Sequence, residues 1–160
     1  MTNKKIFPSK SKILLSFTPV SILLLLVLYF SIGGKFTYFG KSSEEIKSLL
    51  IADAIAFSIW IVLNVVSIFI LFKYNFYIIN NSELIHHRFN KELHYQFNEI
   101  IYIDEKSTLK NRTLLFYTSK GDARYLILDK DKELLKILQT NCKNLLTKEE
   151  FQAKFPNIRL

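Results

Sequence analysis

The residues best placed to do chemistry in this chain lie inside an apolar run of 24 residues, 49–72, which only Asp53 and Asn64 interrupt with strongly polar groups. These two residues are 11 positions apart, which at about 100° per residue brings them within about 20° of each other on an α-helix. Trp60 and Ser67 fall close to the same stripe. In a membrane helix such a stripe usually packs on another helix, because hydrogen-bond partners are available there and absent from lipid. We therefore expect these four residues to mediate helix packing. The alternative is a functional role for Asp53 in a proton or ion path, because acids inside a membrane are often functional.

A second candidate site is the short basic stretch 106–112, which carries Lys106, Lys110 and Arg112 and no acidic residue. The stretch separates two predicted strands, so we expect it to be a loop. If the loop faces a membrane, each cation contributes about 1 kcal/mol of attraction to anionic lipid headgroups. An ordinary solvated loop is the plainer interpretation.

The three histidines and the single cysteine do not combine into an obvious site. His86 and His87 are adjacent on a predicted strand and so point to opposite faces, while His94 lies on the predicted partner strand. No cysteine or suitably spaced acid completes a ligand set, so we expect solvated histidines and no metal site. Cys142 continues an apolar helical stripe and is expected to be buried as a small hydrophobe.

Composition and motifs argue against catalysis and nucleic-acid binding. The chain has no glycine-rich phosphate loop, no nucleophile elbow and no spaced His/Glu zinc motif. Its net charge of +8 is dispersed along 160 residues, which favours anionic lipid over nucleic acid as the partner of a chain so rich in apolar sequence. We expect no enzyme activity, no cofactor and no small-molecule substrate.

Two apolar runs organise the chain. Residues 13–32 hold no charge, and both this run and residues 49–72 reach the roughly 20 residues that a helix needs to cross a bilayer core. A secretory signal peptide begins in a similar way, but its apolar region is usually about 7 to 15 residues long. Four lysines precede the first run and three cations closely follow the second, against three lysines in the connecting loop. The positive-inside rule therefore places both termini in the cytoplasm.

After the second run the pattern changes to the period of two that is typical of half-buried strands. Six strands are predicted, at residues 75–79, 84–89, 93–97, 100–103, 113–118 and 123–128. A turn containing Gly121 joins the last two strands, because glycine tolerates positive φ. From about Lys130 apolar residues recur at helical spacing, which predicts an amphipathic helix that covers the sheet. Thr147 and Glu150 match a capping box, and Pro156 ends any helix that follows.

Six strands and one amphipathic helix, placed directly after two apolar helices, resemble the bacterial pleckstrin-homology-like membrane proteins. The resemblance covers roughly residues 75–142 and is carried by the segments FYIINNSELI, YQFNEIIYI and DKDKELLKIL. It implies a bent, partly open barrel plugged at one end by the helix and used for interaction or assembly. No catalytic or lipid-binding residue is transferred by it, because fold analogy alone does not define a site.

We therefore expect an α+β membrane protein in which a two-helix transmembrane hairpin precedes a small antiparallel β pleckstrin-homology-like barrel closed by a C-terminal amphipathic helix. The expected parts are a basic cytoplasmic N-terminus at 1–12, a transmembrane region at 13–72, a cytoplasmic domain at 73–146 and a tail at 147–160. The expected function is a non-catalytic interaction or assembly module at the cytoplasmic face of the cell membrane. Its expected partners are membrane lipids and a protein partner or a second copy of the chain. The alternative is an accessory subunit of a transport or channel complex that acts through the polar face of the second helix.

Overall fold

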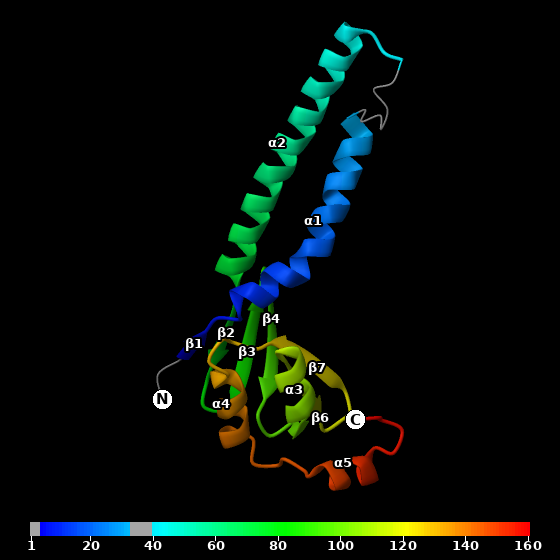
Figure 1. Cartoon of the computed structure of the whole chain (residues 1–160). Helices are drawn as coiled ribbons and strands as arrows, with labels where there is room; N and C mark the ends of the chain where they lie inside the picture. Colours follow the sequence, from blue (N-terminus) through cyan, green and yellow to red (C-terminus); the bar gives the residue numbers. More distant parts are fainter. Residues whose placement is uncertain (1–3, 33–39) are drawn as a thin grey trace. The chain divides into compact units, whose positions relative to one another are not determined.

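The computed structural model describes residues 4–32 and 40–160. The chain divides into two compact units. One is the helical hairpin, Leu14–Leu71, and the other, which we call the β unit, consists of the residues up to Ile13 together with Phe72–Leu160 (Figure 1).

The helical hairpin is built from two long apolar helices, α1 at Lys10–Ile32 and α2 at Ser43–Tyr74. Both are largely exposed, and both are long and apolar enough to cross a membrane. They contact each other through the indole of Trp60, whose Nε1 donates a hydrogen bond to the carbonyl of Ser21 at 2.8 Å. Ala56 is the buried residue of α2. The prediction of two long apolar helices is confirmed.

Four antiparallel strands form sheet A in the order β1-β2-β3-β4. They are β1 at Lys4–Ile6, β2 at Asn75–Ile79, β3 at Glu83–Arg88 and β4 at Lys91–Gln96. The sequence did not predict β1, which pairs with β2 so that Ile6 lies opposite Tyr77. Because β1 precedes α1 and β2 follows α2, the helical hairpin is an insertion in sequence between two paired strands.

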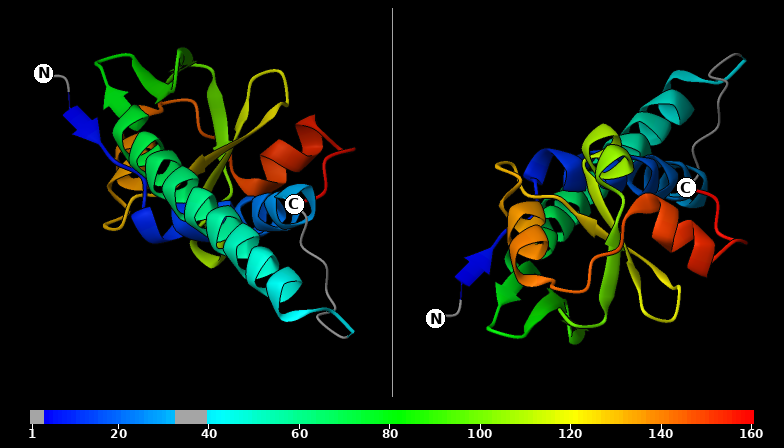
Figure 2. Two further views of the ribbon diagram at one scale, coloured as in Figure 1. Left: turned by 90° about the horizontal axis from the view of Figure 1, so that it is seen from above. Right: turned by 90° about the horizontal axis from the view of Figure 1, so that it is seen from below.

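Sheet B has the order β5-β6-β7, with β5 at Ile100–Ile103, β6 at Thr113–Thr118 and β7 at Ala123–Ile127. Helices α4, Glu133–Asn141, and α5, Lys148–Lys154, lie on opposite sides of this sheet (Figure 2). Alternation along β6 explains its continuous apolar sequence. Its residues that face the main core with α4 are Leu114 and Phe116. Those that pack with α5 around Phe151 are Leu115 and Tyr117.

The predicted partly open barrel is wrong, because the described strands form two separate sheets that do not close into a barrel. The sheets are joined by side chains and a shared core; for example, the buried hydroxyl of Tyr77 donates to the carbonyl of Ile127 at 3.0 Å. Beyond β7 the backbone of Leu128 has other partners. Its N–H donates to the carbonyl of Arg112, and its carbonyl accepts from the N–H of Ser9. The first bond continues the β6–β7 register by one residue pair, and the second joins the chain to the segment before α1.

The basic stretch predicted as a loop is instead the helix α3, Glu105–Asn111. The carboxylate of Asp104 caps its first turn by accepting from the N–H of Ser107 at 2.9 Å. Thr108 is fully buried, and its hydroxyl oxygen accepts from the N–H of Leu115 on β6 at 3.0 Å. The helix therefore depends on a tertiary contact, because its short sequence has no apolar periodicity of its own.

Three further local predictions are confirmed. The six predicted strands are present with bounds that differ by at most two residues. Gly121 has a φ of +84°, as the turn requires, and Thr147 and Glu150 form the predicted capping box at the start of α5.

Candidate functional site: a basic cleft

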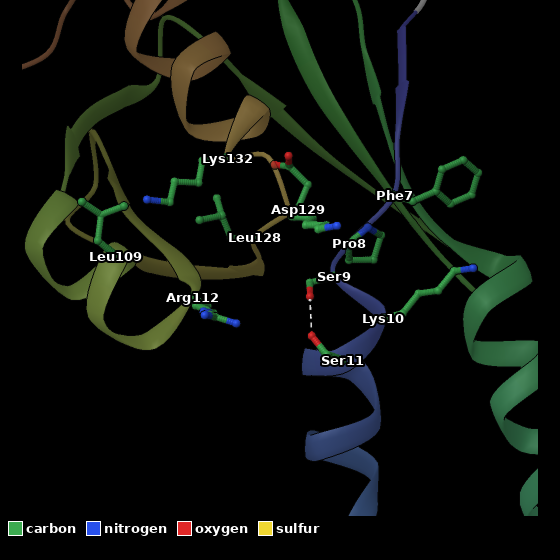
Figure 3. Close-up of a pocket in the computed structure, with 11 residues that line it drawn as sticks. Phe7, Pro8, Ser9, Lys10, Ser11, Leu109, Arg112, Leu128, Asp129 and Lys132 are labelled. Atoms are coloured by element: carbon green, nitrogen blue, oxygen red, sulfur yellow. Dashed lines mark hydrogen bonds between the residues drawn. The ribbon is translucent and has the colours of Figure 1, made fainter.

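A cleft with a volume of about 760 Å³ opens on the β unit where the chain enters α1. Its walls come from the segment before α1, the end of α3 and the connection between β7 and α4 (Figure 3). The residues that line it are Phe7, Pro8, Ser9, Lys10, Ser11, Leu109, Arg112, Leu128, Asp129, Lys130 and Lys132. We call this feature the basic cleft.

The charge of the basic cleft is strongly positive. Arg112, Lys130 and Lys132 are exposed, and none of them forms an ion pair with any residue that the structure describes. The single acid, Asp129, is buried. Its carboxylate accepts hydrogen bonds from the backbone N–H groups of residues 131, 133 and 134, at 3.2, 2.8 and 2.9 Å. The carboxylate of Asp129 therefore caps the start of α4. The three cations remain available to bind an anion.

Two of these cations have unusual backbones. Arg112 ends α3 with φ +51°, and Lys132 precedes α4 with φ +57°. Left-handed φ costs a residue with a side chain about 1 kcal/mol or more, and glycine avoids this cost. The backbone alone therefore favours glycine at both positions, and the long basic side chains are not explained by the fold. Strained residues of this kind cluster at binding sites.

The opposite wall is the beginning of α1. The N–H of Ser9 donates to the carbonyl of Leu128 at 3.1 Å, and the carbonyl of Ser9 accepts from the N–H of Ile13 at 3.1 Å. The hydroxyl groups of Ser9 and Ser11 are 2.9 Å apart. Arg112 projects from the end of α3 toward these serines (Figure 3). The first N–H groups of a helix have no partner within it and carry a partial positive charge, so this wall also favours an anion.

Lys10 contributes differently from the other cations. Its side chain points away from the cleft (Figure 3), and its Nζ lies 5.6 Å from the centre of the Phe72 ring. Lys10 therefore lines the cleft without directing its charged group into it, and this charge adds only to the general positive potential.

The predicted lipid-contact residues are divided by the fold. Arg112 lines the basic cleft, whereas Lys106 and Lys110 line a separate hollow that also includes Lys148. Two further cations, Lys120 and Arg124, belong to the β6–β7 hairpin. They line a third hollow together with Glu99 and Asp122. A helix in place of the predicted loop explains the separation, because it turns successive side chains to different sides.

The expectation of solvated histidines is wrong for His86. This residue is buried on the inner face of β3, with Nε2 2.9 Å from the Oδ1 of Asn75, and its Nδ1 has no hydrogen-bond partner among the described residues. Burial lowers the pKa of His86 to about 4, and the nearby charges of Arg88 and His87 act in the same direction. The other two histidines lie near acids, with His87 3.2 Å from Glu92. Within residues 4–32 and 40–160 no three His, Cys, Asp or Glu side chains form a metal-like group.

Cys142 is buried in the main core, as the apolar stripe predicted. Burial raises the pKa of its thiol to about 12. A thiol with so little thiolate is a poor nucleophile.

The polar stripe of α2 includes a contact between the two helices. Trp60 donates to Ser21 of α1, and Asn64 donates back to the carbonyl of Trp60 at 2.7 Å. Asp53 and Ser67 are partly buried on the same helix. These positions are consistent with packing inside the helical hairpin.

Sequence reasoning missed Lys130, Lys132 and Ser9. The two lysines belong to the segment DKDK before α4. Its sequence predicts the start of a helix and gives no indication of a binding site. In sequence the two acids of this segment balance its two lysines, whereas in the structure Asp129 caps α4 and Asp131 does not line the cleft. No local signal connects Ser9 with them.

Comparisons with known proteins give no relative: no family model matches the chain, and no match was found among curated proteins or solved structures.

Proposed function

We propose that this chain is an integral membrane protein whose β unit binds the anionic headgroup of a phospholipid in the basic cleft. In this proposal the β unit is a non-catalytic interaction or assembly module at the cytoplasmic face of the cell membrane. The observation that carries it is the place of the cleft in the chain. Lys10 and Ser11 line the cleft, and the uncharged apolar run begins at residue 13.

The distance in sequence between the cleft residues and the apolar span gives their position along the membrane normal. A helix rises about 1.5 Å per residue, so residues two or three positions before an apolar span lie at the level of the headgroups when that span crosses the bilayer. Lys10 and Ser11, which line the cleft, are therefore within reach of a lipid phosphate in this proposal.

The pairing of β1 with β2 supports a common side for both ends of the hairpin. Lys4 and Ile6 pair with Ile79 and Tyr77 across the two strands, and the strands flank the two apolar helices in sequence. A chain that crosses the membrane twice returns to the side from which it left. The lysines before α1 and the cations after α2 favour the cytoplasmic side.

Charge and shape favour a phosphate-bearing ligand. Three cations at about 1 kcal/mol each give an attraction on the order of 3 kcal/mol to an anionic headgroup. Arg112 in addition offers the planar fork that matches phosphate oxygens. This attraction is modest, but it is sufficient for a lipid because the lipid is already concentrated at the membrane surface.

A binding experiment with the full chain in neutral detergent tests the proposal. Short-chain phosphatidylglycerol is added, with phosphatidylcholine of equal chain length as the zwitterionic comparison, and the melting temperature of the β unit is measured. At ten times its Kd a ligand adds about 1.4 kcal/mol of stability, which corresponds to roughly 6–11 °C for a domain of this size. Stabilisation by both lipids alike would contradict a headgroup site.

The variant Arg112→Gly/Lys132→Gly removes both left-handed cations and suits the backbone at both positions. We expect it to fold and to lose most of the selective stabilisation. The matched control, Lys120→Gln/Arg124→Gln, removes the same charge from a different hollow. Equal losses in the two variants would mean that net charge, and not the basic cleft, attracts the lipid.

A protein partner or a second copy of the chain remains part of this proposal, since an interaction module needs one. The transport alternative receives less support. Trp60 of the polar stripe donates its hydrogen bond to α1, which favours a packing role for that face.

A further inference from the structure

The hairpin between β3 and β4 has an unusual tip. Its loop is the pair Phe89 and Asn90, and Phe89 has a φ of +59°. Two-residue hairpin loops favour glycine, asparagine or aspartate where φ is positive, because a bulky side chain is strained there. The side chain of Phe89 is 58% exposed. The backbone strain at Phe89 is therefore not offset by burial of its ring.

The tip is fixed to the end of α2. The N–H of Phe89 donates to the carbonyl of Tyr74 at 3.1 Å, and the two rings are 6.1 Å apart. Tyr74 is the last residue of α2 and is 42% exposed. It follows the apolar run by two positions, or about 3 Å of helix rise.

Cations surround this pair of aromatic rings. Lys73 precedes Tyr74, and Arg88 and Lys91 flank the hairpin loop. An exposed aromatic pair with flanking cations matches the headgroup zone of a membrane, where amphipathic rings meet the hydrocarbon edge and basic groups meet phosphates.

We propose that the Phe89 hairpin tip inserts into the interfacial zone of the bilayer that α2 crosses and fixes the β unit against the lipid surface. This inference rests on the proposed membrane insertion of α2. It goes beyond the basic cleft, because the occupant is the bilayer interface itself and the residues are different. The left-handed backbone directs a phenylalanine outward at a place where the fold alone favours glycine or asparagine.

Site-directed spin labelling of the full chain in vesicles tests this contact. Asn90→Cys, which leaves Phe89 in place, is labelled with a nitroxide, while Cys142 is protected by burial and its raised pKa. Collision with oxygen, which concentrates in lipid, is compared with collision with a water-soluble nickel complex. The control is Tyr125→Cys, since Tyr125 is 65% exposed on β7. We expect lipid-like accessibility at position 90 and water-like accessibility at position 125.

A second pair of variants isolates the aromatic ring. A label on Asn90→Cys is measured with Phe89 present and with Phe89→Asn, which suits the left-handed backbone. We expect the label to move from lipid-like to water-like accessibility when the ring is removed, with unchanged protection of Cys142 as the sign of an intact fold. An unchanged label would show that the ring does not hold the tip in the membrane.

Other outcomes are distinguishable. Water-like accessibility at position 90, with Phe89 in place, in protein that resists carbonate extraction would overturn this inference and leave membrane insertion intact. Extraction of the protein by carbonate would instead overturn the proposed function. Dipolar broadening between labels at position 90 would replace the lipid surface by a second copy of the chain and also overturn the inference.

Discussion

The insertion of the helical hairpin between β1 and β2 predicts that a residue before α1 stabilises a domain that lies almost entirely after α2. Ile6 is the test, because it is 5% exposed and packs in the main core opposite Tyr77. Replacing a buried isoleucine by alanine typically costs 2–5 kcal/mol. A three-residue edge strand relaxes easily, so we expect about 2 kcal/mol for Ile6→Ala.

The single cysteine provides the assay. Cys142 is buried in the same core, so a thiol reagent modifies it only when the β unit opens. When closing is fast relative to modification, the labelling rate follows the opening equilibrium. A loss of about 2 kcal/mol then accelerates labelling roughly 30-fold, since 1.36 kcal/mol corresponds to a factor of ten.

Two controls bracket the result. Leu138→Ala, in the same core and on α4, should accelerate labelling at least as much. Lys4→Ala removes an exposed ion pair to Glu133 and should change the free energy of opening by less than about 1 kcal/mol. If Ile6→Ala leaves the rate unchanged while Leu138→Ala raises it, β1 does not stabilise the β unit, and the same-side deduction from strand pairing fails.

Three further outcomes are expected in the same labelling assay. Tyr77→Phe removes the hydroxyl that donates to the carbonyl of Ile127 and should cost about 1 kcal/mol; no change would show that the two sheets are not linked there. Thr108→Val leaves the buried N–H of Leu115 without its acceptor and should cost about 1–3 kcal/mol, whereas Thr108→Ser keeps the bond and should cost less. Because the pKa of His86 is about 4 in the folded chain against 6.5 ordinarily, the unfolded chain takes up the proton first. Stability should be complete above about pH 6.5 and fall as the pH drops toward 4, and a flat profile, or an equal fall in His86→Leu, would contradict this assignment.

Local sequence determined most of the secondary structure. Apolar length gave both helices of the hairpin, and alternation gave β2 to β7, because these signals are repeated within each segment. The turn at Gly121 and the capping box at Thr147 were predictable for the same reason: the residues that satisfy the backbone are its near neighbours. Buried Cys142 followed from helical spacing alone.

Tertiary structure decided β1, α3 and the separation of the two sheets. A strand of three residues is too short to show a period, and the partner of β1 lies beyond two long helices in sequence. Thr108 anchors α3 from a buried position that its sequence does not reveal. Sheet closure likewise depends on which strands pair across the fold, and the described strands of sheet A do not pair with those of sheet B.

The basic cleft shows the same division. Sequence alone identified Arg112 as a cation without nearby acids, but grouped it with Lys106 and Lys110. Folding separates these three and brings Arg112 beside Lys130 and Lys132. The charges of a short segment can be read from its sequence. The net charge of a cleft depends in addition on which acids cap helices and on which distant segments pack together. The sequence therefore determined that this protein has two apolar helices and a basic, strand-rich remainder, and only the packing of that remainder decided where its positive charge converges.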